Sequence, residues 1–336
     1  MEPRQIAWLF PGQGSQAVGM GKDLLEASAA ARDVFARADA ALGDSPPLSR
    51  LILEGPEEEL TLTANAQPAL VTMSAAVLAA MRERYPSLPA PRFAAGHSLG
   101  EYSALVAADA LSLEDAVRLV RARGLAMQAA VPEGEGSMAA IIGIDAERIE
   151  EICREVIAEL GETVSCANFN CPGQVVIAGR ARAVSRVSER VRERPTSEDG
   201  PPPSRRSSIP LRVSAPFHCV LMAPAADVIR AELQAIEIRP LAFPIVANFD
   251  ALPNSDPERA KELLVHQVAS AVRWEQAVTF MHSAGVTHAI EIGAGKALAG
   301  MCKRTAKAMR VLSVSDLAGL EAIAAFLESP APEPAP

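Results

Sequence analysis

The sequence predicts an α/β fold whose large domain is built on a mostly parallel sheet. Short apolar runs alternate with helical patterns almost from end to end, as strands joined by crossover helices do. The chain has 336 residues, of which 49% are hydrophobic and 22% charged, so it can bury a substantial core. A different order of patterns, β-α-β-β-α-β, occupies the middle of the chain and predicts a small inserted subdomain.

Strands and helices alternate in the first part of the large domain. The expected elements are, in order, a strand at 6–10, a helix at 66–84, a strand at 92–96 and a helix from near Leu99. The first strand ends in the Pro-Gly turn of "FPGQGSQ". Ser112 and Asp115 then form a capping box, which predicts the start of an amphipathic helix within 111–130.

The inserted subdomain is expected over 134–210, and its pattern is that of a ferredoxin-like unit. Its elements are, in order, a strand at 137–144, a helix at 146–160, strands at 163–169 and 174–179, a helix at 181–194 and a strand at 209–213. The stretch 194–208, "RPTSEDGPPPSRRSS", is rich in Pro, Ser and charge, which predicts a mobile surface loop.

The large domain resumes after the insert, so it is discontinuous and is expected to cover 1–133 and 211–328. Its later elements are a strand at 243–249, helices within 257–284, a strand at 288–293, a helix from Lys296, a strand at 311–314 and a closing helix. The tail 329–336, "SPAPEPAP", is too rich in proline to pack and is predicted to be disordered.

Composition and charge exclude several classes of protein. The formal net charge is −9 and the sequence pI is near 5.2, whereas nucleic-acid binding needs a surplus of Lys and Arg. No apolar run approaches the roughly 20 residues of a membrane-spanning helix. The N-terminus "MEPRQIAWLF" lacks the pattern of a signal peptide, and the five scattered cysteines lack zinc-binding spacing. We therefore expect a cytoplasmic protein with reduced thiols and no metal.

Ser98 is the strongest candidate for a catalytic residue. It lies in "GHSLG", which matches G-x-S-x-G between a strand and a helix, the pattern of a nucleophile elbow. A tight strand-to-helix turn needs small residues on either side of the serine, and it lifts the hydroxyl clear of the sheet. The hydroxyl then lies at a helix N-terminus, where backbone N–H groups can stabilise an oxyanion. This motif predicts a large domain similar to an α/β hydrolase.

A serine nucleophile needs a base, usually a histidine, and the chain offers five. His97 adjoins the serine and is expected to point away from it and pack under the turn. His266 and His282 lie in amphipathic helices, where they are most simply solvated, and His288 opens a strand. His218 lies in "VSAPFHC", where the chain returns from the insert, among mostly apolar neighbours. It is therefore the preferred base, although a core histidine satisfied by structural partners is the alternative.

The segment "FPGQGSQ" supports two interpretations. Gly12, Gly14 and Ala17 fit the pattern G-x-G-x-x-A after a strand, a weak dinucleotide-binding signal that calls for an acidic residue at a strand end about 20 residues on. Asp33 and Asp39 have the spacing, but Asp33 falls within the helical pattern "ASAAARDVFARADAAL" rather than at a strand end. Alternatively, the loop brings a backbone N–H, such as that of Gln13, close to the nucleophile as an oxyanion donor.

Arg123 lies on an apolar helix face. Ala116, Val120, Arg123 and Met127 share that face, whereas Arg118 and Arg121 lie on others. An arginine cannot shed its charge, so a buried one needs an anion opposite it. A structural Asp or Glu is one possible partner. A substrate carboxylate, gripped by the planar guanidinium, is the other.

Six ordered motifs now identify a resemblance. The chain is similar to the malonyl-CoA:acyl carrier protein transacylases of fatty acid synthesis in "FPGQGSQ", "GHSLGEYSAL", "ARGLAMQ", "NFNCPGQVVIAG", "VSAPFHC" and "EIGAGKALAGMCKR". The match extends from about residue 5 to 315 and includes the insert. The resemblance implies an acyltransferase that carries malonyl from malonyl-CoA, through an acyl-serine, to the phosphopantetheine thiol of a carrier protein, with no cofactor.

The resemblance also implies a role for each matching residue. The roles are Ser98 as nucleophile, His218 as base, the backbone N–H groups of Gln13 and Leu99 as oxyanion hole, Arg123 as the carboxylate-binding residue, the main-chain carbonyl of Gln267 as the group that orients the base, and Phe217 and Met127 as the acyl pocket. The histidine then needs no third acid. Carrier proteins are acidic, so docking needs a local basic patch. Candidates are Lys303, Arg304, Lys307 and Arg310, with Arg205 and Arg206.

Other functions remain open on the sequence. A polyketide carrier could replace the fatty acid carrier as acceptor. A serine esterase or thioesterase would share Ser98 and His218, but it has no use for Arg123 on an apolar face. A nicotinamide-dependent oxidoreductase depends on the weak glycine pattern alone, and a non-catalytic scaffold would bind the carrier without transferring an acyl group. The basic candidates are equally compatible with a solvated charged face.

Overall fold

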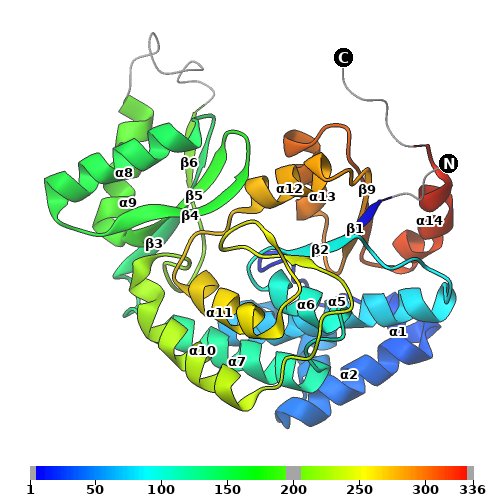
Figure 1. Ribbon diagram of the computed structural model, residues 1–336. Helices are drawn as coiled ribbons and strands as arrows, with labels where there is room; N and C mark the ends of the chain where they lie inside the picture. Colours follow the sequence, from blue (N-terminus) through cyan, green and yellow to red (C-terminus); the bar gives the residue numbers. More distant parts are fainter. Residues whose placement is uncertain (1–4, 194–205, 331–336) are drawn as a thin grey trace.

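A computed structural model describes residues 5–193 and 206–330. It has two parts, each built on its own sheet, with the small one to the left of Figure 1 and the large one to the right. Most of the predicted loop at 194–208 and most of the tail at 329–336 lie outside the described residues.

The large part is built on a six-stranded sheet in the order β10-β9-β1-β2-β7-β8. Its strands are β1 (Ile6–Phe10), β2 (Phe93–Gly96), β7 (Ile245–Val246), β8 (Pro253–Asn254), β9 (His288–Ile292) and β10 (Arg310–Val314). Every pair is parallel except β7 with β8, so the predicted parallel α/β sheet is confirmed. The carboxyl ends of β1 and β2 therefore lie side by side, as catalytic loops on such a sheet require.

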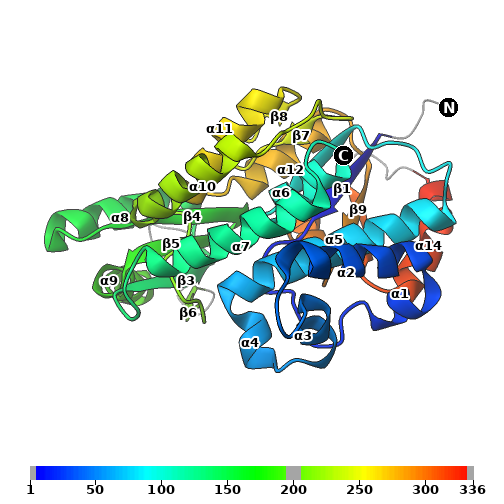
Figure 2. The same cartoon turned by 90° about the horizontal axis from the view of Figure 1, so that it is seen from below.

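Helices cover both faces of this sheet, because successive side chains of a strand point to opposite faces. On β1, Ile6, Trp8 and Phe10 belong to one core, and Ala7 and Leu9 to the other. The helices that complete the first core are α2 (Ala29–Leu42), α5 (Thr63–Arg84), α6 (Gly100–Ala107), α7 (Leu113–Ala129), α10 (Ala223–Ala235) and α14 (Leu317–Glu328). The helices that complete the second core are α12 (Trp274–Ser283) and α13 (Ala297–Thr305). Figure 2 shows α2, α5 and α7 running across the underside.

Helix α5 passes through the centre of the first core. By length and composition alone it could cross a membrane, so the expectation that no run is long and apolar enough was wrong. Burial explains its composition, because 83% of the apolar stretch lies inside the protein, against α2, α6 and α7. It is the core helix of a folded domain, and it carries Gln67, which accepts a hydrogen bond from Arg123.

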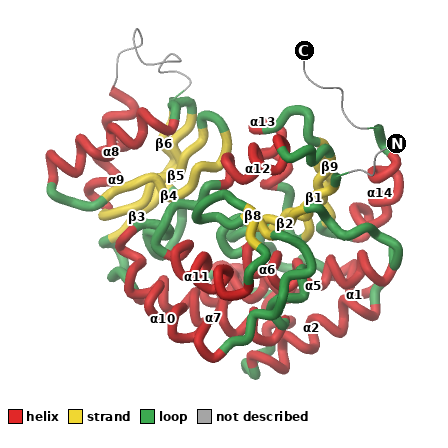
Figure 3. Tube along the Cα trace, in the orientation of Figure 1, coloured by secondary structure: helices red, strands yellow, loops and turns green. Residues whose placement is uncertain are grey.

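The small part is a four-stranded antiparallel sheet in the order β4-β5-β3-β6, with two helices packed on it. Its elements, in chain order, are β3 (Gly136–Ile142), α8 (Ala146–Leu160), β4 (Val164–Cys171), β5 (Gln174–Arg180), α9 (Ala181–Glu193) and β6 (Ser207–Pro210). The predicted order of strands and helices is confirmed. The last strand ends at Pro210, earlier than the sequence suggested, because its ladder to β3 stops there. Figure 3 shows the two groups of strands as separate sheets.

Several elements, most of them short, were not predicted. They are α1 (Lys22–Ala27), α3 (Leu48–Glu54), α4 (Glu57–Thr61), a 3-10 turn η2 (Val220–Met222), α10 and β8. Helix α11 (Pro257–Val268), by contrast, lies within the region 257–284 where helices were predicted. The helices of one or two turns are too short for a period of 3.6 to show in sequence. Helix α10 begins with Ala-Pro, and a proline in the first turn of a helix is easily taken for a break.

Candidate active site

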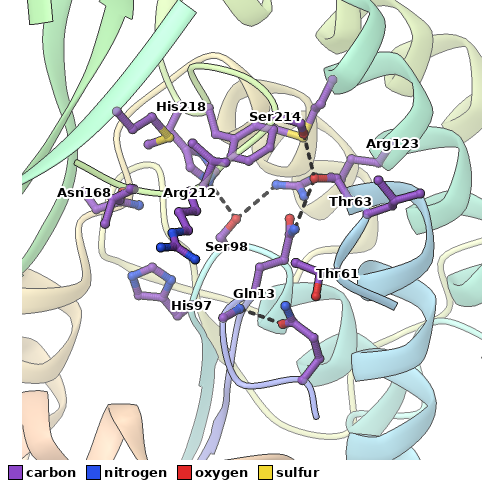
Figure 4. A pocket seen from close by; sticks show the side chains of 18 of the residues that line it. Gln13, Thr61, Thr63, His97, Ser98, Arg123, Asn168, Arg212, Ser214 and His218 are labelled. Carbon is purple, nitrogen blue, oxygen red and sulfur yellow. Dashed lines mark hydrogen bonds between the residues drawn. The ribbon is translucent and has the colours of Figure 1, made fainter. Parts of the chain in front are cut away.

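A cavity of about 480 Å³ opens where the two parts of the molecule meet. The large part contributes Ser98 and Arg123, and the small part contributes Met138 of β3 and Asn168 of β4. The chain that returns from the insert adds the segment 211–218. Figure 4 shows Ser98 near the centre of the group, with dashed lines to His218 and to Arg123. Residues far apart in sequence thus share one solvent-accessible space.

Ser98 lies at a strained turn between β2 and α6. Its φ is 51°, a left-handed value that is uncommon outside glycine and that is typical of residues held for function. The flanking glycines are required by space. A Cβ on Gly96 would lie 1.8 Å from the carbonyl carbon of Gly100, and one on Gly100 would lie 2.0 Å from the carbonyl oxygen of Phe10. The elbow geometry predicted from "GHSLG" is therefore present.

The substitution Gly100→Ala is expected to destabilise the fold strongly, because the new methyl group would overlap backbone that cannot move without displacing β1. We expect a loss of about 3 kcal/mol in the free energy of unfolding, measured by urea denaturation. Gly300→Ala is the matched control. That position lies in α13 with open space around it, so alanine there should leave stability unchanged or slightly higher. Equal effects at both positions would contradict this account.

His218 is placed to act as a base toward Ser98. Its Nε2 lies 2.7 Å from the Ser98 Oγ, and its Nδ1 lies 3.0 Å from the main-chain oxygen of Gln267. A carbonyl oxygen only accepts, so Nδ1 carries the proton and Nε2 is the acceptor facing the hydroxyl. The residue has a φ of 60°, a second strained backbone position. Burial, together with the nearby Arg123 charge, lowers the pKa of His218 to about 3, so the imidazole is neutral at physiological pH.

Arg123 is almost completely buried, with 1% of its surface exposed. Its Nη1 donates to Gln67 Oε1 (2.9 Å), and its Nη2 donates to Gln267 Oε1 (3.0 Å) and to the Ser98 Oγ (3.2 Å). The ring of Tyr102 lies 5.5 Å from the guanidinium carbon. Among the described residues no carboxylate forms an ion pair with it. Of the two partners considered for this arginine, a structural acid is therefore absent from its contacts, and its neighbours are neutral amides.

The resemblance assigns the oxyanion hole to the backbone N–H groups of Leu99 and Gln13. Leu99 precedes the first turn of α6, and Gln13 follows β1 in the loop beside the cavity. Within the described part of the chain, neither N–H donates a hydrogen bond. The N–H of Ser98 itself is already occupied, since it donates to Asn248 Oδ1 at 2.6 Å. The two free donors and the positive end of α6 suit a developing negative charge.

The remaining predicted site residues also reach the cavity. Met127 and Phe217 line it and are themselves buried. Gln67, which the sequence analysis did not single out, contacts three of its neighbours. Besides Arg123, its Nε2 donates to Gln13 Oε1 at 3.1 Å and faces the Met127 sulfur at 3.9 Å. Gln67 thus links Arg123 to the loop that carries Gln13.

The other histidines have partners of their own. His97 borders the cavity, but its ring makes no hydrogen bond to Ser98: its Nε2 lies 2.9 Å from Asn170 Oδ1, and the ring packs against Trp274. His266 is exposed and stacks on Phe249, and His282 is half-buried. His288 opens β9 and is buried beside Thr287.

Neither acidic residue considered for the dinucleotide interpretation lies at a strand end. Asp33 and Asp39 both lie within α2, and Asp39 accepts hydrogen bonds from Ser49. The loop after β1 instead faces Ser98 across the cavity through Gln13 and Gly14. The geometry therefore favours the second interpretation, in which the loop serves the nucleophile.

The candidate docking residues differ in their surroundings. Lys303, Lys307 and Arg310 are exposed. Arg304 donates to the carbonyl oxygen of Pro172 at 2.8 Å, so it ties α13 to the small sheet. Arg206 is buried and Arg205 lies outside the described residues. The five cysteines are free and buried, as expected for reduced thiols.

The fold and the residues around this cavity define an acyltransferase of the α/β class. A family model described as an acyl transferase domain matches residues 7–322. The chain belongs to the malonyl CoA-acyl carrier protein transacylase family. It is 48% identical over 312 residues to the Bacillus subtilis protein of that name, and the alignment covers 93% of this chain and 94% of the relative.

Solved structures agree with this assignment. An acyl-carrier-protein-S-malonyltransferase from Bartonella henselae is 44% identical, with a TM-score of 0.89 over 97% of this chain and 100% of the other. A malonyl-transacylase solved in complex with a type II PKS acyl-carrier protein is 42% identical, with a TM-score of 0.87 over 95% and 98% of the two chains.

Proposed function

We propose that this enzyme transfers a malonyl group from malonyl-CoA, through an ester on Ser98, to the phosphopantetheine thiol of an acyl carrier protein. The observation that carries the proposal is the convergence on one hydroxyl. The neutral imidazole of His218 and the buried guanidinium of Arg123 both contact the Ser98 Oγ, and they approach it from different sides (Figure 4). A base and a carboxylate-binding group at one nucleophile suit an acyl donor that carries a free carboxylate.

The first half of the reaction forms the acyl-enzyme. His218 Nε2 takes the Ser98 proton as Oγ attacks the thioester carbonyl, and the N–H groups of Gln13 and Leu99 hold the oxyanion. The C–S bond then breaks, and the proton moves from Nε2 to the CoA sulfur. The Gln267 carbonyl stabilises the transient imidazolium through Nδ1–H. In the second half, the carrier thiol gives its proton to the same nitrogen and attacks the ester carbonyl. The C–O bond then breaks as Nε2 returns the proton to Ser98 Oγ.

Selectivity for malonyl is proposed to come from two sides of the acyl pocket. Arg123 grips the free carboxylate with its planar guanidinium, which Gln67 and Gln267 hold in place without neutralising it. Phe217 and Met127 limit the volume beside the α-carbon of the acyl group. An acyl group without a carboxylate leaves a buried cation unpaired, which is costly.

We propose a fatty acid carrier as the acceptor. One comparison favours a polyketide carrier as a second candidate acceptor. The relative solved with a type II PKS acyl-carrier protein shows that a transacylase 42% identical to this one binds a polyketide carrier. The exposed lysines Lys303 and Lys307 are proposed to contribute to docking of an acidic carrier.

Transfer and hydrolysis are distinguished by the fate of the acyl-enzyme. We expect incubation with malonyl-CoA alone to give a malonyl-serine that persists, and addition of a phosphopantetheinylated carrier to move the malonyl group onto the carrier. Intact-mass measurement of both proteins follows the two steps. Rapid loss of the adduct to water, with no malonyl-carrier formed, would identify a thioesterase and contradict the proposal. Carriers from fatty acid and polyketide synthesis, compared by kcat/KM, decide the acceptor.

The finer description of the fold is part of the same proposal. We infer an α/β-hydrolase-like large domain over 1–133 and 211–328 with a ferredoxin-like insert over 134–210, supported by the elbow at Ser98 and by the strand order β4-β5-β3-β6. The chemistry above uses only side chains and backbone of this chain, so no cofactor is proposed, and the expected compartment is the cytoplasm.

A further inference from the structure

Glu101 is a buried carboxylate beside the site, bonded to two of its supporting residues, and the mechanism above does not use it. It lies in the first turn of α6, three residues after Ser98, and is only 3% exposed. A buried carboxylate is costly unless it accepts hydrogen bonds. Its Oε2 accepts two, from the side-chain amide of Gln267 at 2.9 Å and from the backbone N–H of Asn248 at 2.9 Å.

Each of these two partners forms hydrogen bonds to other residues of the site. Gln267, which is fully buried, presents its main-chain oxygen to His218 and its side-chain oxygen to Arg123. Its Nε2 donates to Glu101 and to the Ser98 carbonyl oxygen. Every polar atom of its side-chain amide is thus used, and the acceptor on Glu101 fixes which end of the amide faces Arg123.

Asn248 makes the second connection. Its Oδ1 accepts from the Ser98 N–H at 2.6 Å, and its Nδ2 donates to the Gly96 carbonyl oxygen at 2.6 Å. The side chain therefore clamps both sides of the strained elbow, while its own backbone N–H is held by Glu101. A turn kept at a left-handed φ needs such support from its surroundings.

We propose that Glu101 is a positioning residue for the transfer reaction, whose carboxylate orients Gln267 and Asn248 and through them Arg123, His218 and the Ser98 elbow. The inference depends on the proposed malonyl transfer. It also explains how a buried arginine remains available to substrate. Gln267 separates Glu101 from Arg123, so the negative charge lies close enough to offset the cation but does not occupy its hydrogen-bonding edge.

The charge on Glu101 also predicts a dependence on pH. Burial raises the pKa of Glu101 to about 7, against the lowering effect of its hydrogen bonds from Gln267 and Asn248. The charged and titratable groups acting on it are Arg123 on α7, Asp250 after β7 and Tyr102 on its own helix. Below pH 7 the neutral acid leaves the Arg123 charge less compensated, which strengthens carboxylate binding. The same protonation removes a negative charge that stabilises the transient imidazolium of His218, so the chemical step should slow.

The test compares three forms of the enzyme. Glu101→Leu removes both the acceptor and the charge, and we expect kcat/KM for malonyl-CoA to fall by about 100-fold. Glu101→Gln keeps an oxygen that can accept both hydrogen bonds, so its kcat/KM should be at least about tenfold higher than that of Glu101→Leu. In the wild type, KM and kcat should both fall, by about threefold, between pH 8 and pH 6. In Glu101→Gln, KM and kcat should no longer change between pH 8 and pH 6.

Glu291 provides the matched control. It is a fully buried carboxylate on β9 that accepts from the backbone of Leu298 and Ala299 and from Ser313, away from the cavity. Glu291→Leu and Glu291→Gln lose a buried acid in the same way, so they report the cost to folding alone, measured by thermal unfolding. Their pH profiles of KM and kcat should match the wild type.

Two results would overturn the inference. One is a folded Glu101→Leu enzyme with kcat/KM within about threefold of the wild type. The other is a Glu101→Gln enzyme that keeps the wild-type pH dependence and recovers nothing relative to Glu101→Leu. Failure of the underlying function has a different signature, because wild-type enzyme would then form no malonyl-serine with malonyl-CoA at any pH.

Discussion

Ser98→Ala is expected to abolish the acyl-enzyme and to lower the rate of malonyl transfer by at least about a thousandfold. The substitution removes the only hydroxyl that contacts both His218 Nε2 and Arg123 Nη2 among the described residues. Alanine also fits the volume, so the rest of the cavity should persist. Intact-mass spectra after mixing with malonyl-CoA should show an added malonyl group in the wild type and none in the variant.

Ser103→Ala is the matched control for this experiment. Ser103 lies on α6, the helix that follows Ser98; it is buried, and its hydroxyl has no hydrogen-bond partner in the described residues. Its removal should leave malonylation unchanged. A malonyl adduct on the Ser98→Ala enzyme that survives digestion and maps to another residue would contradict the assignment of the nucleophile.

Arg123→Met is expected to lower kcat/KM for malonyl-CoA by about 100- to 1000-fold, because the substrate carboxylate would lose its buried charged partner. Methionine fits an apolar helix face, but it leaves the side-chain oxygens of Gln67 and Gln267 without their donor. Reactions with acetyl-CoA should therefore also slow, though far less. The decisive quantity is the ratio of kcat/KM for malonyl-CoA to that for acetyl-CoA, which should collapse toward one or below.

Arg118→Met provides the control on the same helix. Arg118 is exposed and pairs with Asp115 at the helix N-terminus, away from the cavity. Its loss should alter neither kcat/KM nor the ratio. An Arg123→Met enzyme that keeps its preference for malonyl-CoA would show that the carboxylate is recognised elsewhere, for example by Arg212, which also lines the cavity.

The strands and long helices were readable from the sequence because burial imposes a period on them. The run at 6–10 became β1 with the same bounds, and the capping box at Ser112 began α7 as predicted. The elements that were missed, such as α3 and α4, are one or two turns long, and their positions are set by tertiary packing against α5. Such segments carry little local signal.

The site was predictable where one residue type breaks a pattern, and not where chemistry depends on convergence. Ser98 stood out by its glycines, and Arg123 by its place on an apolar face. Gln267 was reached only through the family resemblance, and Asn248 was not found at all. Asn248 follows β7, a strand of only two residues, yet contacts Ser98 from 150 positions away. Nothing local distinguishes such an asparagine from one in an ordinary turn.

The order of the reactive groups along the chain has a consequence for biosynthesis. Ser98 and Arg123 precede the small sheet, whereas His218 and Gln267 follow it. During synthesis, the chain up to the small sheet therefore contains Ser98 and Arg123 but lacks the imidazole that contacts the hydroxyl. These groups can meet only after the residues that follow the small sheet have been made.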